Sequence, residues 1–278
     1  MNGGTRSVKA PNSATRRPTV VLSAAGFDPS AGAGILADLK VFTAHGLYGV
    51  SAITAITVQS TKGVMEVHSA DPEIFGHTLE CLFEDMPIAG VKIGMLGSAD
   101  IVAELARFLL DARIARERIV LDPVLASSSG AALLDREGIR VLREELLPLV
   151  GWVTPNVDEL AALTGERVSG REEVAEQAGR LAGLAGGLNV VVTGGHLDPP
   201  DDLLRTSAGE VVWFPGRRVD TTSTHGTGCV FASALLCRLV AGDTAAAAVR
   251  GAKQFVTRAL ESAMPVGKGR GPVLSGLR

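Results

Sequence analysis

Short runs rich in Val, Ile and Thr alternate along this chain with amphipathic helical patterns, and no other feature of the sequence restricts the fold as strongly. The runs predict strands over residues 19–25, 49–59, 90–93, 119–121, 152–154 and 189–193. The patterns between them predict helices over residues 35–45, 72–83, 99–111, 136–146, 157–163 and 171–184. This order favours a sheet with right-handed crossovers. We therefore predict an α/β fold with helices on both faces of a central, mostly parallel sheet.

The two ends of the chain are expected to differ in order. Residues 1–17 carry four basic residues among polar ones and have no apolar core, which is typical of a disordered tail and not of a signal peptide. Towards the other end, residues 203–215 predict a hairpin, followed by two Ala-rich helices over 229–240 and 244–262. Because no linker or repeat interrupts the pattern, residues 18–278 are predicted to form a single domain.

Composition excludes several classes of function. Aromatic residues make up only 4% of the chain, so its 46% of hydrophobic residues fill the core mainly with Ala, Val, Leu and Ile. A net charge of −3 offers no basic field for nucleic acid or an anionic membrane, and no apolar run reaches the ~18 residues of a membrane span. Three cysteines without CxxC spacing argue against a disulfide framework and fit a reducing cytoplasm. We expect a cytoplasmic protein with neither nucleic acid nor membrane as partner.

A glycine-rich segment before the first Ala-rich helix is the sharpest local signal. Gly226, Thr227 and Gly228 precede Cys229 and an apolar helix, so backbone amides and the helix N-terminus are expected to cradle a phosphate. A cysteine at the first helical position is expected to have a lowered pKa and to serve as a base. The alternative, a plain glycine-rich turn before a buried helix, explains the glycines but not the cysteine. These four residues are the candidate catalytic group.

Other polar residues are ambiguous without further information. Ligands of open α/β sheets bind beyond the carboxyl ends of the strands, where Gly26, Gln59, Asp122 and Asn156 are expected. Gln59 is equally well interpreted as a strand-end side chain facing water. Asn156 and Glu159 also have an ordinary structural interpretation, because an asparagine followed three residues later by a glutamate is typical of a helix N-terminus.

Lone charged, histidine and cysteine residues carry weaker expectations. Asp38 by itself is read as a solvated helix charge, and Lys92 as a strand-end lysine facing solvent or phosphate. His45, His68 and His77 share no ligand spacing and are expected to be surface or satisfied core residues. Cys81 and Cys237, each in an apolar helical pattern, are expected to be packing residues.

Eight motifs in order resemble one known family. The motifs read AGFDPS, GAGIxADLK, TVQST, KIGML, LDPV, TPNxxE, GGH and HGTGC, and the resemblance covers residues 19–273. Together they resemble the hydroxymethylpyrimidine/phosphomethylpyrimidine kinases of thiamine biosynthesis, which have a ribokinase-like fold. The resemblance implies two successive transfers from ATP, first to the alcohol of 4-amino-5-hydroxymethyl-2-methylpyrimidine and then to the monophosphate.

The resemblance also assigns roles to residues. On the substrate side it implies Gln59 as the reader of the pyrimidine, with Gly26, Asp38 and Val124 around the ring. For the nucleotide and Mg²⁺ it implies the following set, in which Asp122 and Glu159 serve the metal: Asp122, Asn156, Glu159 and Thr193. It further implies a homodimer and a mobile cover over the site, supplied by residues 203–215 or 127–132.

Three positions depart from the family pattern. Ser128 and Thr193 stand where the family commonly has lysines, so two positive charges near the phosphates are missing. Ala31 replaces a usual glycine and is expected to stiffen its loop. Two alternatives therefore stay open: a pyridoxal or related vitamin kinase of the same fold, and a pyrimidine-binding protein that has lost phosphoryl transfer.

Overall fold

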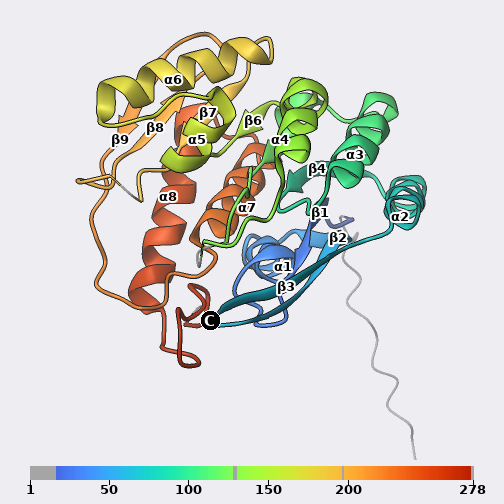
Figure 1. Ribbon diagram of the computed structural model, residues 1–278, viewed down its shortest axis with the longest axis horizontal. Helices are drawn as coiled ribbons and strands as arrows, with labels where there is room; N and C mark the ends of the chain where they lie inside the picture. The colour runs from blue at the N-terminus through green and yellow to red at the C-terminus, as the bar shows by residue number, and fades with distance from the viewer. Residues whose placement is uncertain (1–16, 128–129, 196, 277–278) are drawn as a thin grey trace, which may run out of the picture.

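The computed structural model describes residues 17–127, 130–195 and 197–276, and one mixed sheet runs through this part of the chain (Figure 1). Its nine described strands lie in the order β3-β2-β1-β4-β5-β6-β7-β8-β9. The six strands from β2 to β7 pair in parallel, whereas β3, β8 and β9 pair antiparallel at the two edges. The bounds are β1 Val20–Phe27, β2 Tyr48–Ser60, β3 Gly63–Ser69, β4 Ile88–Ile93, β5 Ile119–Leu121, β6 Trp152–Val153, β7 Asn189–Val192, β8 Asp202–Arg205 and β9 Val211–Phe214.

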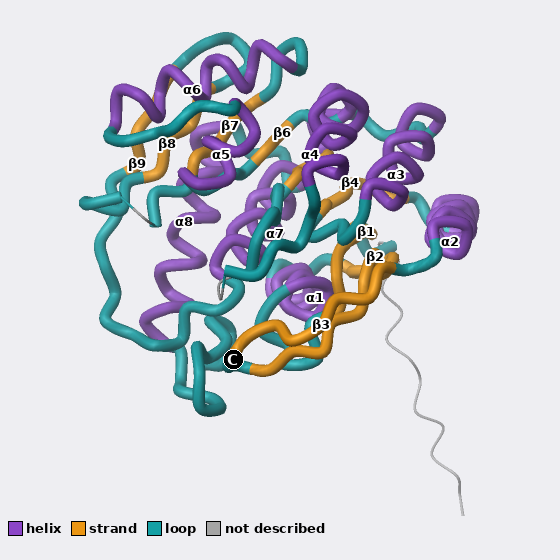
Figure 2. The backbone as a smooth tube through the Cα atoms, in the orientation of Figure 1, coloured by secondary structure: helices purple, strands orange, loops and turns teal. Residues whose placement is uncertain are grey.

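Helices cover both faces of the sheet, as predicted (Figure 2). One apolar layer joins the sheet to α2 Pro72–Asp85, α3 Ala99–Asp111, α4 Arg136–Val141, α5 Val157–Thr164 and α6 Arg171–Leu184. The opposite layer joins it to α1 Gly34–Ala44, α7 Thr227–Val240 and α8 Ala245–Ser262. Along β1, Leu22 and Ala24 pack into the first layer and Val21 into the second, because successive side chains of a strand point to opposite faces.

The structure confirms the predicted elements with small shifts of their ends. The hairpin near the carboxyl end is present as β8 and β9, and Asp71 caps α2 by accepting hydrogen bonds from two backbone amides. The helix predicted over residues 136–146 is irregular in its second half, where a π-helical turn Leu142–Leu146 follows α4. None of the described helices is long and apolar enough to cross a membrane.

The sequence-based expectation missed one strand. β3 pairs antiparallel with β2 after a tight turn at Thr61-Lys62, and Gly63 begins the strand with a positive φ of 141°. The alternation of apolar and polar residues from Met65 to His68, shortly after a glycine, is the hairpin signal that was available. The hairpin extends the sheet beside the carboxyl ends of the central strands.

Candidate active site

The predicted site residues gather at the carboxyl edge of the parallel strands. Gly26 and Gln59 end β1 and β2, Asp122 follows β5, Asn156 follows β6 and Thr193 follows β7. The helix α7 begins at the same edge with Thr227, Gly228 and Cys229. In the sheet, β2 pairs with β1, and β4 connects β1 to the adjacent strands β5, β6 and β7. This order brings residues from distant parts of the sequence together.

Two glycine-rich loops interlock at this edge. Gly226 has a φ of 86°, and a Cβ atom there would overlap the carbonyl oxygen of Gly32. Gly34, with a φ of 56°, packs so closely against the carbonyl group of Gly26 that it also has no room for a side chain. The loop before α1 and the loop before α7 therefore touch backbone to backbone, which only glycine allows.

Asp28 organises the first of these loops, a role that the sequence analysis missed. Its Oδ1 accepts hydrogen bonds from the backbone and hydroxyl of Ser30 at 2.8 and 2.7 Å, and its Oδ2 accepts from the backbone amide of Ala33 at 2.9 Å. The same Oδ2 lies 2.7 Å from Nε2 of His225, which belongs to the other loop. Gln59 Nε2 lies 3.0 Å from that ring nitrogen, so one cluster joins the two loops to the end of β2.

We expect Asp28→Asn to destabilise the protein by about 1.5–3 kcal/mol at pH 7, because hydrogen bonds to a charged, buried carboxylate are lost. Burial alone raises the pKa of Asp28, but the hydrogen bonds from His225 and Ser30 bring it below the usual value of an aspartate. The carboxylate therefore stabilises the fold above about pH 4, and this contribution disappears as the pH falls through the lowered pKa. Urea unfolding at several pH values tests this, with the exposed Asp111→Asn as the control. Parallel pH profiles for wild type and Asp28→Asn would contradict it.

Ala31 adopts a left-handed conformation. Its φ is 56°, and it is the one described non-glycine residue with a positive φ. The alanine that stands here in place of the family's usual glycine was expected to stiffen the loop, and its left-handed backbone also strains the loop. We expect Ala31→Gly to raise the free energy of unfolding by about 0.5–1 kcal/mol, the relief of strain less the extra entropy of a glycine. Chemical denaturation measures the change, and a loss of stability would show that Ala31 is unstrained.

The carboxylates of Asp122 and Glu159 lie near the segment Gly226 to Cys229, which we call the cradle. Asp122 is 3% exposed, and its Oδ2 has no hydrogen-bond partner. Burial raises the pKa of Glu159 to about 8, and the charge of Asp122 adds to this shift. A Cβ atom at Gly228 would lie 3.8 Å from Oδ1 of Asp122, so the carboxylate faces the start of α7. An orphaned buried oxygen next to a second carboxylate fits Mg²⁺, which prefers such oxygen ligands.

The carboxylate pair has few companions as metal ligands. No group of three or more His, Cys, Asp or Glu side chains suited to a metal occurs in the part of the chain that the structure describes. This composition suits Mg²⁺, since that ion commonly binds one or two carboxylates and completes its shell with water and phosphate oxygens.

Asn156 and Glu159 form a capping box at the start of α5. Asn156 Oδ1 accepts a hydrogen bond from the Glu159 amide, and Glu159 Oε2 accepts one from the Asn156 amide, both at 2.9 Å. The ordinary reading of these two residues as a helix start is thus confirmed. Asn156 also pairs with Thr193, so the ends of β6 and β7 place both residues next to Glu159.

The predicted lowering of the Cys229 pKa is wrong. Burial of the thiol raises the pKa of Cys229 to about 12, and this effect outweighs the opposing influences of the Lys92 charge and the Gly34 amide. The carboxylates of Asp122 and Asp38 raise it further, and the thiol is hydrogen-bonded to Asp122. The sequence shows the helix N-terminus that favours a thiolate, but not the enclosure and the two carboxylates that oppose it.

Asp38 and Lys92 are both buried, which corrects the expectation that they are solvated. Each is 0% exposed, and Lys92 Nζ donates to Asp38 Oδ2 at 3.0 Å. The Asp38 carboxylate also accepts hydrogen bonds from Ser23 at 2.6 Å and Ser233 at 2.7 Å. With its oxygens occupied inside the core, Asp38 lies beneath the site and not on its surface, so the contact with substrate that the resemblance implied is not what this geometry offers.

A small apolar cluster lies at the same edge of the sheet. Val124 packs with Ala55, Met95 and Leu133 in this cluster. A Cβ atom at Gly26 would lie 3.1 Å from the Met95 sulfur, so the glycine borders the same cluster. The apolar cluster, the bare backbone at Gly26 and the amide of Gln59 provide a surface for a flat ring with polar edges.

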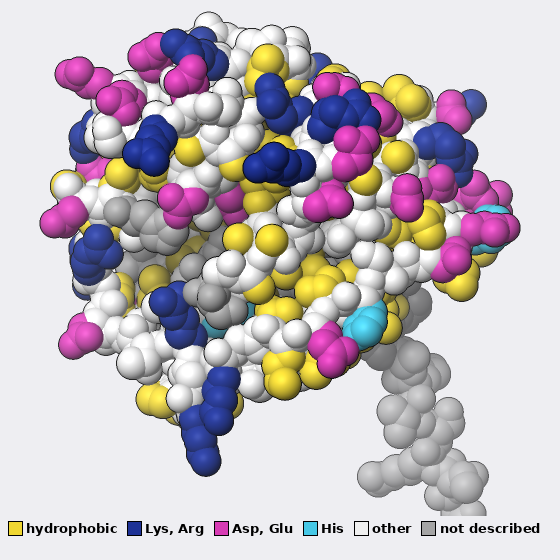
Figure 3. Space-filling model, viewed as in Figure 1, with side chains coloured by type: hydrophobic (Ala, Val, Ile, Leu, Met, Phe, Trp, Pro, Cys, Tyr) yellow, Lys and Arg dark blue, Asp and Glu magenta, His cyan; other side chains and the backbone are white. Residues whose placement is uncertain are grey.

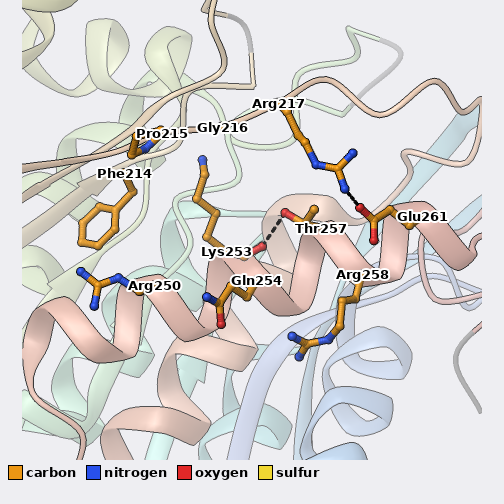
Figure 4. A pocket seen from close by; sticks show the side chains of 10 residues that line it. All are labelled: Phe214, Pro215, Gly216, Arg217, Arg250, Lys253, Gln254, Thr257, Arg258 and Glu261. Atoms are coloured by element: carbon orange, nitrogen blue, oxygen red, sulfur yellow. Dashed lines mark hydrogen bonds and ion pairs between the residues drawn. The ribbon is translucent and has the colours of Figure 1, made fainter.

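A basic hollow of about 630 Å³ lies between α8 and the segment that follows β9 (Figure 4). Residues of α8 form one wall, and Phe214 to Arg217 form the other. Four cations and one carboxylate line it: Arg217, Arg250, Lys253, Arg258 and Glu261. Lys253 pairs with Asp202 at 2.7 Å, and Asp202 accepts from the Gly194 amide, which links the hollow to the end of β7. The sequence analysis missed it, because its walls are far apart in the chain.

Two sequence predictions cannot be placed. Ser128 and His196 lie outside the described residues, as do residues 1–16 of the expected tail. On the face of the molecule shown in Figure 3, acidic and basic side chains are interspersed over the described surface.

Phosphoryl transfer depends mainly on positioning and on charge stabilisation, so it needs donors aimed at phosphate oxygens and a place for a cation beside them. At this edge, backbone amides lie at the start of α7, and the carboxylates of Asp122 and Glu159 offer oxygen atoms of the kind that a cation requires. Fold and site thus define a class, the α/β kinases of small molecules.

Comparison with known proteins narrows this class. A family model described as phosphomethylpyrimidine kinase matches residues 28–274. A hydroxymethylpyrimidine/phosphomethylpyrimidine kinase from Haemophilus influenzae is 39% identical over 257 residues, which cover 91% of this chain and 94% of the relative. A thiamine biosynthesis bifunctional protein from Geobacter sulfurreducens is 43% identical over 255 residues, but the chain spans only 51% of that protein.

Solved structures agree with the fold. The phosphomethylpyrimidine kinase of Clostridium difficile superposes with a TM-score of 0.76 at 35% identity, covering 87% of this chain and 99% of that one. A Staphylococcus aureus pyridoxal kinase in complex with AMP-PCP and pyridoxal gives a TM-score of 0.83 at 28% identity, covering 93% and 94%. The chain therefore has the predicted ribokinase-like fold, and it belongs to the phosphomethylpyrimidine kinase family.

Proposed function

We propose that this protein transfers the γ-phosphoryl group of ATP to 4-amino-5-hydroxymethyl-2-methylpyrimidine and then to the resulting monophosphate. The observation that carries the proposal is the juxtaposition of the cradle at Gly226 to Cys229 with Asp122 and the apolar cluster at Val124. Membership of the kinase family supports the same reaction. One site on a single domain of residues 18–278 serves both steps in this proposal.

The acceptor lies against Gly26 and Val124, with its polar edge towards Gln59. The Gln59 amide is held by Thr57, whose hydroxyl donates to Oε1 at 3.2 Å, and by its contact with His225. A fixed amide presents its donor and acceptor in one orientation, which suits an aminopyrimidine edge. Asp38 contributes from below through the buried network and does not touch the ring.

The phosphates lie at the start of α7. Amides of Gly226, Thr227 and Gly228 face them, and the helix N-terminus adds partial positive charge. Asp122 and Glu159 would hold Mg²⁺, which neutralises phosphate charge when it is bound. Asn156 and Thr193 border the same space from the ends of β6 and β7. Cys229 accepts the proton of the alcohol as its own thiol proton passes to the Asp122 carboxylate, to which the thiol is hydrogen-bonded.

The basic hollow beside α8 holds the rest of the nucleotide. Its volume of about 630 Å³ lies within the range of small-molecule sites, and its cations complement an anionic ligand. The hydrogen bond from Gly194 to Asp202 connects it to Thr193 on the phosphate side. Fluorescent ATP analogues displaced by ADP would measure binding here, with loss of binding expected for substitutions in the hollow.

A homodimer in the cytoplasm completes the proposal, and light scattering of the purified protein tests the dimer. The hairpin β8–β9 and residues 127–132 are the two segments proposed to cover the site. Residues 128 and 129 of the second segment lie outside the described residues, and on either side of them the Ser127 hydroxyl accepts a hydrogen bond from the Ala131 amide at 3.0 Å.

A second candidate acceptor is pyridoxal, because pyridoxal kinases superpose on this chain with TM-scores of 0.80 to 0.84. An assay that offers the hydroxymethylpyrimidine and pyridoxal in parallel decides between the two through kcat/KM. A higher kcat/KM for the pyrimidine supports the main proposal, and a higher value for pyridoxal replaces it. Pyrimidine binding without turnover of ATP would indicate a binding protein that has lost phosphoryl transfer.

A further inference from the structure

A fully buried ammonium group lies under the candidate active site. Lys92 is 0% exposed, and its Nζ lies 3.0 Å from Asp38 Oδ2 and 3.9 Å from Asp122 Oδ2. A buried ammonium group is strongly unfavourable unless anions pair with it. The ammonium group thus sits between two carboxylates, one in the core and one in the site.

The first carboxylate, that of Asp38, is an anchor. It is fixed from three further directions, by Ser23 on β1, Ser233 on α7 and its own helix α1. Ser233 lies four residues after Cys229, on the same face of α7. The network therefore connects Lys92 to the first turns of the helix that begins with the cradle.

The second carboxylate, that of Asp122, has a different environment. Its Oδ2 has no hydrogen-bond partner, and Lys92 lies within ion-pair distance of that oxygen. The Cys229 thiol is hydrogen-bonded to the same carboxylate, and the Lys92 charge acts to lower the pKa of this thiol. Neutralisation of the Asp38 charge by Lys92 does not explain why the ammonium group also lies within ion-pair distance of Asp122. Without it, two buried carboxylates would face each other with no cation between them.

We propose that Lys92 is a positioning residue for phosphoryl transfer, whose buried charge holds Asp122 and, through it, Cys229 in their working arrangement. This inference rests on the proposed kinase function. It assigns to Lys92 a role towards the site that is separate from its pairing with Asp38. Lys92 touches neither acceptor nor nucleotide, because its side chain has no exposed surface.

Three variants separate this role from a purely structural one: Lys92→Met, Asp38→Asn and the double variant Lys92→Met/Asp38→Asn. The double variant removes the buried pair together, so it is expected to recover most of the thermal stability that Lys92→Met loses. Arg113→Met, in an exposed loop before β5, is the control for loss of one positive charge.

Turnover distinguishes the two roles. We expect kcat with the pyrimidine alcohol to fall by about 100-fold in Lys92→Met, with little change in its KM, because Asp122 and Cys229 are no longer held in their working arrangement. The double variant should regain stability but not kcat. Recovery of kcat together with stability in the double variant would overturn the proposal, since Lys92 would then only balance Asp38.

A binding measurement keeps the inference testable apart from turnover. We expect Mg²⁺ to increase ADP affinity in the wild type, and this increase should largely disappear in the stable double variant because Asp122 is no longer held. Calorimetric titration of ADP with and without Mg²⁺ measures it. An unchanged Mg²⁺ effect in the double variant contradicts the role of Lys92. A wild type that phosphorylates none of the acceptors, but shows the Mg²⁺ effect, would instead refute the kinase function alone.

Discussion

Replacement of Cys229 by alanine should reduce kcat for the first phosphorylation by about 100-fold or more, while the second phosphorylation loses far less. The alcohol must lose a proton as it attacks, and Cys229 lies beside the cradle with its thiol hydrogen-bonded to Asp122. A phosphate monoester, whose second pKa is near 6, is already largely ionised at neutral pH and needs mainly positioning. Steady-state rates with the alcohol and with the monophosphate measure the two effects separately.

The size of the difference is the informative quantity, because Cys229→Ala also removes packing at the start of α7. Cys237→Ala, a buried cysteine on the same helix, is the matched control for lost packing. Equal losses in both steps would rule out Cys229 as the base. The high pKa of Cys229 makes this outcome a real alternative, since a thiol with a pKa of about 12 is protonated at neutral pH until a partner takes its proton.

Asp122→Asn should impair both phosphorylations, with kcat reduced by about 100- to 1,000-fold. Asp122 is the buried carboxylate with an unpaired oxygen at the cradle, and it is proposed to hold the cation that serves the nucleotide in each step. The Mg²⁺ concentration for half-maximal rate should rise in the variant. Because Asn keeps the shape of the side chain, the fold should change little.

The exposed Asp111→Asn at the end of α3 is the matched control for loss of one carboxylate. A loss confined to the first step would assign Asp122 to proton transfer from the alcohol and not to the nucleotide. Activity and Mg²⁺ dependence equal to those of the wild type would remove Asp122 from the site altogether.

The central sheet was predictable because its strands leave a strong local signal. Runs such as those of β1 and β5 are buried on both faces, so their composition alone marks them. The loops at their carboxyl ends were then predictable from topology, which placed Asp122, Asn156 and Gln59 at one edge. β3 was missed because it is an edge strand without buried residues, in which side chains such as Met65 and Glu66 are exposed.

The buried ion pair of Lys92 and Asp38 beneath the site was not predictable in the same way. Lys92 and Asp38 lie 54 positions apart, and only the packing of α1 against the sheet brings them together. A lysine between Val91 and Ile93 in a central strand must be buried on one face, but its partner leaves no local pattern. The pKa of Cys229 likewise depends on enclosure by residues from β4, β5 and α1.

Incubation of the purified protein with ATP, Mg²⁺ and 4-amino-5-hydroxymethyl-2-methylpyrimidine, with products resolved by mass over time, tests the central claim most directly. We predict that the monophosphate appears first and is converted to the diphosphate by the same protein, and that Asp122→Asn strongly slows the formation of both products. Formation of neither product under conditions where pyridoxal is phosphorylated, or where the pyrimidine binds without consumption of ATP, would contradict the account.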